Sequence, residues 1–281
     1  MIRIAEVENP EQLYRYQLRF QSPCFFPVDY RTWRESFFND VDGSGWVLFK
    51  KLSVKAAYDE DVLIGFIQYG ITAFGFDDRG EISSDVSYCV IRNLYFTETR
   101  ADAGSLLLKE ALDAFGTAER IYAFFHYFGM SCFARHGKLF ESQSHIEAFL
   151  KENGFETEHE NVYYSSVLCG AEKPEAEIIP QALTASSQQY FDFALSGNHV
   201  GGCEIHFVDA KTAYLRWIYV NENITGKGIG TKCMNTLKHW LYQKGITRFD
   251  TDTALSNAVA QHYYEKNRFT REGITRSFYR G

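Results

Sequence analysis

The chain has 281 residues, of which 45% are hydrophobic and 16% aromatic, enough to build two packed domains and to argue against disorder over most of its length. The formal net charge is −7 and no dense run of lysine or arginine is present. Because duplex binding rests on neutralising phosphates, we expect no nucleic acid partner.

The first half alternates strands and helices. In chain order we expect a strand at Ile2–Val7, helices at Glu11–Phe20 and Tyr30–Asn39, strands at Gly45–Ala57, Val62–Thr72 and Val86–Phe96, a helix at Asp102–Gly116, a strand at Arg120–Tyr127, a helix at His145–Asn153 and a strand at Val162–Val167. This order predicts a mostly antiparallel sheet with helices against it, an α+β fold.

A break in composition follows. Residues 169–181 have little apolar content and include Pro174 and Pro180, which predicts a linker between a domain at 1–168 and a domain at 182–281. The second half repeats the later elements: strands at Gln189–Ala194, Cys203–Val208 and Tyr214–Val220, a helix at Gly228–Lys244, a strand at Arg248–Thr253 and a helix at Asn257–Lys266. No room is left for the pair of helices that follows the first strand of the other half, so the C-terminal domain is expected to lack them.

Two segments bear on membranes and export. Met1–Tyr14 alternates charged and single apolar residues, so no secretory signal is predicted. The most apolar stretch, Val62–Phe76, is shorter than the ~20 residues of a membrane helix and is interrupted by glycines. We therefore expect a cytoplasmic protein with no membrane partner.

Cysteine and histidine spacing predicts no metal site. The cysteines contain no C-x-x-C pair and no cluster with histidines, so reduced thiols are expected. They are Cys24, Cys89, Cys132, Cys169, Cys203 and Cys233. His126, His136 and His145 fall in one region, but their spacing is not that of a helix face carrying a metal.

The segment that is most informative about chemistry is Val220–Thr231, VNENITGKGIGT. A strand ends there in a loop with alternate glycines, Gly226, Gly228 and Gly230, and an amphipathic helix begins at once. Glycines let the backbone approach a ligand closely, and a helix N-terminus offers unpaired N–H donors with a partial positive charge. The segment predicts an anion site suited to a diphosphate, with a plain tight turn as the alternative.

A second motif follows at Asp250–Phe269, DTDTALSNAVAQHYYEKNRF. It resembles the strand-to-helix segment of the GNAT acetyltransferase superfamily, usually written N-x-x-A-x-x-x-Y-E-K-x-G-F, and the glycine loop resembles that family's Q/R-x-x-G-x-G/A signature. The chain departs from the family at Thr225, in the Arg/Gln position, and at Arg268, where the family prefers Gly. The resemblance covers about Leu215–Arg276, and the first half shares the order of elements.

The resemblance implies two GNAT-like domains and transfer of an acetyl group from acetyl-CoA to a small-molecule or peptide amine. By position, the loop residues would hold the pyrophosphate and the end of the preceding strand would bind the pantetheine arm. The loop residues are Thr225, Gly226, Lys227, Gly228, Ile229, Gly230 and Thr231, and the strand residues are Ile218, Tyr219 and Val220. A backbone N–H near Tyr219 or Val220 would polarise the thioester carbonyl. Asn257 would contact the pantetheine, cap a helix, or do both.

Tyr264 stands in the position of the family's tyrosine that protonates the departing thiolate. A phenol, with a pKa of about 10, can give a proton as charge grows on sulfur, whose thiol pKa is about 8.5. The alternative is an aromatic residue that packs the helix on the sheet, for which the adjacent Tyr263 is better placed. No base is assigned among the carboxylates on strand ends, which are Glu204, Asp209, Glu222, Asp250 and Asp252.

The first half lacks the corresponding features. Ala101, Ala103 and Ser105 occupy the positions of the three glycines, Arg100 keeps a basic residue, and Leu150 takes the position of Tyr264. Added Cβ atoms hinder approach to phosphate, and leucine has no proton to donate. We therefore expect cofactor binding in the C-terminal half only. A catalytically silent acyl-CoA sensor is the alternative function.

Overall fold

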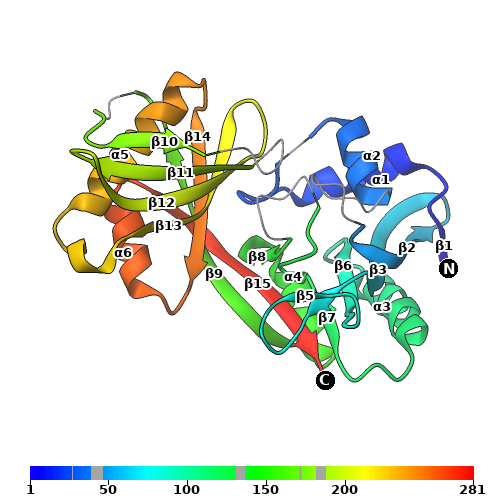
Figure 1. Cartoon of the computed structure of the whole chain (residues 1–281). Helices are drawn as coiled ribbons and strands as arrows, with labels where there is room; N and C mark the ends of the chain where they lie inside the picture. Colours follow the sequence, from blue (N-terminus) through cyan, green and yellow to red (C-terminus); the bar gives the residue numbers. More distant parts are fainter. Residues whose placement is uncertain (27, 39–46, 131–136, 171–172, 182–187) are drawn as a thin grey trace. The chain divides into compact units, whose positions relative to one another are not determined.

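The computed structural model describes residues 1–26, 28–38, 47–130, 137–170, 173–181 and 188–281. These residues form two compact units, one of residues 1–160 with 275–281 and one of residues 161–274 (Figure 1). Both combine helices with a mixed sheet, so the α+β class is confirmed. Among the described helices, none combines the length and apolar character needed to cross a bilayer.

The first unit contains a sheet of strand order β1-β2-β3-β6-β7-β15. Its strands are β1 (Ile2–Glu6), β2 (Phe49–Asp59), β3 (Val62–Thr72), β6 (Cys89–Phe96), β7 (Ile121–Ala123) and the last part of β15 (Thr270–Arg280), with β8 (Leu139–Phe140) also on β15 and a separate hairpin of β4 (Gly75–Phe76) and β5 (Ile82–Ser83). β6 and β7 are parallel, and the other main pairs are antiparallel. β7 ends well before the predicted Tyr127, because Phe124 adopts a left-handed φ of 52°.

Helices cover this sheet through an aromatic-rich core. They are α1 (Pro10–Gln17), α2 (Tyr30–Phe38), α3 (Ala101–Phe115) and α4 (Ser144–Glu152), with short 3-10 turns η1 (Leu18–Phe20) and η2 (Glu141–Gln143). α1 begins where Asn9 Oδ1 accepts the N–H groups of the first turn and a proline occupies its first position. Most of the aromatic run 122–128 is buried, while Tyr127 is 48% exposed, so the run serves mainly as core.

The second unit contains a sheet of strand order β9-β14-β13-β12-β11-β10. Its strands are β9 (Glu156–Val167), β10 (Glu177–Pro180), β11 (Gln188–Leu195), β12 (Asn198–Phe207), β13 (Thr212–Val220) and β14 (Arg248–Ala254), and its helices are α5 (Ile229–Gln243), α6 (Ala258–Lys266) and the 3-10 turn η3 (Glu222–Ile224). Only β13 and β14 are parallel among these pairs. In the described part of residues 161–221 there is no helix, in keeping with the expected absence of the first helix pair.

The limits of the two units differ from the predicted domains 1–168 and 182–281. In the predicted linker, 177–180 form β10, which pairs with β11, and residues 161–167 of β9 pair with β14 inside the second unit. At the other end of the chain, Phe278–Arg280 of β15 pair with Ala123–Ile121 of β7 inside the first unit. Most of β9, the last long strand of the first half of the sequence, thus belongs to the second unit, and the end of β15, the last strand of the second half, belongs to the first unit.

Candidate functional site

The strands β13 and β14 part beside a β-bulge. Their parallel pairing runs from Thr212↔Arg248 to Leu215↔Thr251, whereas β13 continues to Val220. The register of β12 against β13 shifts between Glu204 and Ile205, which leaves Arg216 outside the pairing. Beyond Leu215, β13 is therefore paired with β12 on one side, and no described strand pairs with its other side. Ile218, Tyr219 and Val220 lie on this open edge, where alternate backbone groups can bond an extended ligand.

The glycine loop leads from β13 into α5 with its N–H groups available. Gly226 and Gly228 have φ of 75° and 78°, and a Cβ built on either meets nothing within 4 Å, so glycine serves the left-handed backbone there. The N–H groups of Ile224 and Thr225 close the η3 turn. Those of residues 226–231 donate to no described residue. This row of free donors lies at the positive end of a helix of 15 residues, an arrangement that suits an anion.

The loop side chains do not cover these donors. Thr225 Oγ1 donates to the carbonyl of Glu222 at 2.9 Å, and the Lys227 ammonium lies 3.4 Å from the carbonyl of Asn223. Both loop residues are exposed, so the lysine can add positive charge beside the N–H row.

Gly230 packs closely against Tyr263. A Cβ built on it would lie 3.2 Å from Cε2 of Tyr263, tighter than most Cβ contacts, so the ring would have to shift by a few tenths of an ångström. The Tyr263 hydroxyl donates to the Gly230 carbonyl at 2.8 Å. Tyr263 thereby joins α6 to the first turn of α5, while Val259, one turn earlier, is 83% exposed.

Tyr264 lies at the point where the two parallel strands part. Its ring is 6% exposed and packs 5.7 Å from the ring of Tyr164 and 5.5 Å from that of Phe269. Its hydroxyl interacts with the Thr251 side chain, and Thr251 Oγ1 donates to the Leu215 carbonyl at 3.0 Å. Burial raises the pKa of Tyr264 above its ordinary value, and the interaction with Thr251 opposes the rise. The phenol is therefore protonated near neutral pH beside the open edge of β13.

Asn257 is the N-cap of α6. Its Oδ1 accepts the N–H of Ala260 at 3.0 Å. Its side-chain amide nitrogen donates to no residue of the described ranges, so the capping role leaves a donor for the predicted pantetheine contact.

Most of the carboxylates that were candidates for the general base already form hydrogen bonds or ion pairs. Asp250 is fully buried and accepts from Tyr163 at 2.7 Å and from Arg248. Asp252 accepts from Asn161 and from Tyr214.

Glu204, also buried, pairs with Arg216 and accepts from the Trp217 indole at 2.8 Å. Asp209 closes a turn by accepting the N–H groups of Lys211 and Thr212. Glu222 is exposed on η3. None of these environments singles out a base.

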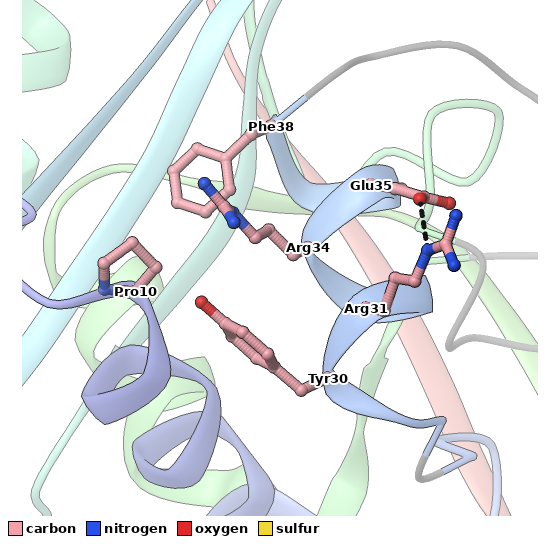
Figure 2. A pocket seen from close by; sticks show the side chains of 6 residues that line it. All are labelled: Pro10, Tyr30, Arg31, Arg34, Glu35 and Phe38. Carbon is pink, nitrogen blue, oxygen red and sulfur yellow. Dashed lines mark hydrogen bonds and ion pairs between the residues drawn. The ribbon is translucent and has the colours of Figure 1, made fainter.

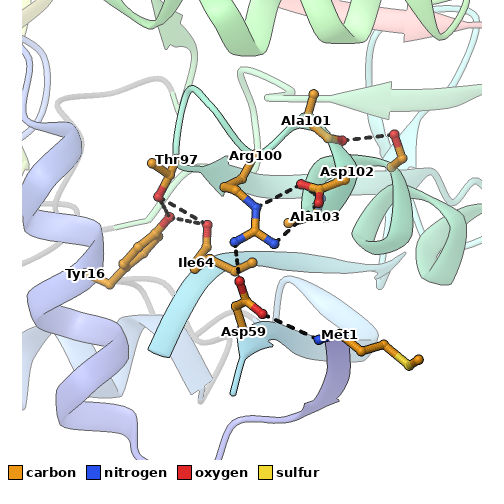
Figure 3. A network of polar contacts seen from close by, with 10 residues as sticks. Met1, Tyr16, Asp59, Ile64, Thr97, Arg100, Ala101, Asp102 and Ala103 are labelled. Atoms are coloured by element: carbon orange, nitrogen blue, oxygen red, sulfur yellow. Dashed lines mark hydrogen bonds and ion pairs between the residues drawn. The ribbon is translucent and has the colours of Figure 1, made fainter. Parts of the chain in front are cut away.

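The equivalent region of the first unit is closed by its own residues (Figure 3). Arg100 pairs with Asp59 at 2.8 Å and with Asp102 at 3.1 Å. The guanidinium N–H groups that could bind a phosphate are therefore already bonded to two carboxylates. α3 already begins at Ala101, because alanine favours the helix where the second unit has glycines. The N–H of Ala103 donates to the Arg100 carbonyl and to Asp102 Oδ1, which removes it as an anion donor.

The strand edge of the first unit is closed as well. β6 and β7 pair from Cys89↔Ile121 to Ile91↔Ala123, and β6 shifts register against β3 beside Arg92, so β6 and β7 part as β13 and β14 do. Here His145 Nε2 lies 3.0 Å from the Phe96 carbonyl. Leu150, in the position of Tyr264, is fully buried in the core. These contacts support the expectation that the first unit binds no acyl-CoA.

A separate pocket of about 610 Å³ lies at α1 and α2 of the first unit (Figure 2). Its lining residues are Pro10, Tyr30, Arg31, Arg34, Glu35 and Phe38. Arg31 is paired with Glu35 at 3.1 Å. None of the predicted site residues lines this pocket.

Comparisons with known proteins bear on the family and fold. Residues 151–269 match the model of the Acetyltransferase (GNAT) family. A tandem GNAT protein from the clavulanic acid biosynthesis pathway is similar over 99% of this chain and 98% of its own, with a TM-score of 0.64 and 10% identity. A GCN5-related N-acetyltransferase from Sphaerobacter thermophilus is similar over 99% of this chain and 95% of its own, with a TM-score of 0.59 and 10% identity.

A third similar structure is the GCN5-related glucosamine N-acetyltransferase region of a fungal multi-domain GH3 β-N-acetylglucosaminidase, with a TM-score of 0.66 and 11% identity. This likeness covers 99% of this chain and 38% of that protein. No curated protein matches the chain. Residues 151–269 therefore match the GNAT acetyltransferase family, and along its whole length the chain has the fold of a tandem GNAT protein.

Proposed function

We propose that this protein transfers an acetyl group from acetyl-CoA to the amine of a small molecule or peptide, and that its second unit binds the acetyl-CoA. One observation carries the proposal: a row of N–H groups at residues 226–231, without acceptors among the described residues, and the protonated phenol of Tyr264 flank the same open strand edge. The first feature suits a diphosphate and the second suits a leaving thiolate.

Acetyl-CoA would supply a thioester, whose carbonyl carbon the amine attacks and from which the thiolate leaves. The N–H groups of Gly226–Thr231 would hold the diphosphate, and the edge at Ile218–Val220 would bond the pantetheine arm. An N–H near Tyr219 or Val220 would stabilise the charge that develops on the carbonyl oxygen. Tyr264 would donate its proton to sulfur, and water would take the proton from the amine.

Two exposed aromatic rings on β13, with a partly buried ring on β11 beside them, offer a surface for the acceptor. Trp217 is 38% and Tyr219 47% exposed, and their ring centroids are 5.8 Å apart. Tyr190 lies 5.9 Å from Trp217. Since Tyr219 is also on the open edge of β13, an acceptor on these rings would be next to the thioester. Aromatic faces attract organic cations, which fits an amine acceptor.

The presence of Tyr264 as a proton donor distinguishes an enzyme from a silent sensor. A sensor needs the anion site but no proton donor, so a buried tyrosine held by Thr251 at the parted strands favours transfer. Release of free thiol from acetyl-CoA, followed with a panel of amines, distinguishes the two. Acetyl-CoA binding without thiol release for any amine would favour the sensor.

The binding site itself is tested with Gly228→Asp and its neutral isostere Gly228→Asn. Both side chains meet the same left-handed φ of 78°, which asparagine and aspartate tolerate better than other residues, and both project into open space. Only aspartate places a negative charge beside the N–H row. We expect Gly228→Asp to weaken acetyl-CoA binding in calorimetry by at least about tenfold more than Gly228→Asn. Equal acetyl-CoA affinities in the two folded variants would show that the diphosphate does not bind at this loop.

A further inference from the structure

The first unit contains a second group of chemically competent side chains. His126 follows β7, and Glu158 and His159 are consecutive on β9. One donor atom of each, an imidazole nitrogen or a carboxylate oxygen, lies within 4.8 Å of the other two. His159 Nε2 is 4.0 Å from Glu158 Oε1, and the rings of the two histidines are 4.6 Å apart. Sequence spacing gave no sign of this group, because folding alone brings His126 to β9.

Neighbouring residues hold two of these donors in place. Ser277 Oγ donates to Glu158 Oε2 at 3.1 Å, which leaves Oε1 facing His159. His126 is 8% exposed, and its ring lies 3.9 Å from that of Tyr127. His159 is exposed and gives the group access to solvent. A carboxylate oriented by a hydroxyl beside a packed imidazole is the support that metal ligands usually have.

Two cationic side chains act on this group. The Lys138 ammonium acts on both Glu158 and His159, and the Arg120 guanidinium acts on Glu158. The two cationic side chains also repel a metal ion, so the affinity is expected to be moderate, with a dissociation constant on the order of 1 µM.

We propose that His126, Glu158 and His159 form a binding site for a zinc-class divalent cation, with two imidazole nitrogens and Glu158 Oε1 as ligands. Tetrahedral zinc at about 2.0–2.1 Å from each donor sets the donors about 3.4 Å apart. The donors, at most 4.8 Å apart, must therefore approach one another by up to about 1.4 Å, which rotation of the Glu158 and exposed His159 side chains can supply. A set of three donors leaves one position for water. Imidazole favours Zn²⁺, Co²⁺ or Ni²⁺ over Mg²⁺ and Ca²⁺, which prefer oxygen.

The test uses the full chain without a histidine tag, freed of metal by chelation. Every sample carries Cys169→Ser, because this exposed thiol would bind zinc by itself. Zn²⁺ is titrated in competition with a chromogenic chelator, and Mg²⁺ serves as a negative control. We expect one equivalent of Zn²⁺, and about 100-fold weaker binding in His159→Gln and in Glu158→Gln. His262→Gln, at an exposed histidine of α6, should bind zinc as the parent does.

Cobalt adds a second measurement that identifies the donor atoms. Co²⁺ in the site should show visible ligand-field absorption without a thiolate charge-transfer band, and His159→Gln should lose it. His159 is exposed, so this variant is expected to fold, and circular dichroism checks that it does. A thiolate band, a lack of stoichiometric zinc binding, or equal zinc affinity in His159→Gln and His262→Gln would overturn the proposal.

Discussion

The Tyr263 hydroxyl donates a 2.8 Å hydrogen bond to the carbonyl oxygen of Gly230, and so connects α6 to the first turn of α5. Tyr263→Phe removes this bond, which is worth about 1 kcal/mol. Because the N–H row is then held less rigidly, the affinity for acetyl-CoA should fall about fivefold. The value of kcat should stay the same, because Tyr264 is unaltered. Tyr242→Phe, at a 38% exposed tyrosine of α5, is the control. A fall in kcat as large as the loss of affinity would contradict this division of roles.

Tyr264→Phe should lower kcat by about 100-fold, since the hydroxyl acts as the thiolate leaves, and should change acetyl-CoA affinity little. The ring remains, so its packing against Tyr164 and Phe269 is kept. Single-turnover kinetics measure the chemical step directly. Turnover within a factor of about two of the parent would make Tyr264 a packing residue.

The pH profile tests the same phenol in another way. Burial raises the pKa of Tyr264 above its usual value of about 10, so the proton donor is intact throughout pH 6–10. Activity should therefore rise with pH as the acceptor amine loses its proton, with no decline assignable to Tyr264 below pH about 10. Tyr264→Phe should lower the whole profile by one factor. A descending limb near pH 8 that vanishes in this variant would contradict the raised pKa.

One acetyl-CoA per chain is expected. Arg100→Gln should leave affinity and stoichiometry unchanged, because Asp59 and Asp102 already occupy this guanidinium. Lys227→Gln is the matched change in the second unit, where the ammonium is exposed beside the free N–H groups. It should weaken binding by about threefold at low salt and less at high salt. Calorimetry at two ionic strengths separates the two cases, and a weaker complex in Arg100→Gln would indicate a second site.

The sequence predicted the α+β class, the second-unit motifs and most elements because these depend on local patterns. The expected strand Val62–Thr72 matches β3 at both ends, and Asp102–Gly116 differs from α3 by one residue at each end. Alternating apolar residues and a helical stripe encode these segments within a few neighbours.

Long-range pairings could not be predicted from such patterns. β15 was missed altogether, and β10 falls where prolines suggested a linker. Pro180 can end a short edge strand, since such a strand needs partners on one side only. Several contacts at the two sites also join residues far apart in the sequence. They are the hydrogen bond between Tyr263 and Gly230, the contact of Tyr264 with Thr251 and the ion pair of Arg100 with Asp59. No single sequence displays such contacts.

Phe278→Ala should destabilise the first unit by about 3–5 kcal/mol, because this ring is fully buried in the first unit's core. Tyr279→Ala is the neighbouring control: its side chain is partly exposed and hydrogen-bonded to Glu156, so its loss should cost less. Urea unfolding followed by near-UV circular dichroism measures both. Equal losses would mean that the end of β15 contributes pairing but no core packing.

The exchanged strands impose an order on biosynthesis. A ribosome makes β7 before the whole of the second unit, and the partner residues of β7, Phe278–Arg280, follow that unit in the sequence. Until these residues emerge, one edge of β7 therefore stays unpaired, and such edges invite aggregation. The first unit can be completed only after synthesis of the second, in contrast to the usual vectorial folding of tandem domains. Nascent chains stalled before residue 275 should accordingly remain protease-sensitive in the first unit and be clients of ribosome-associated chaperones.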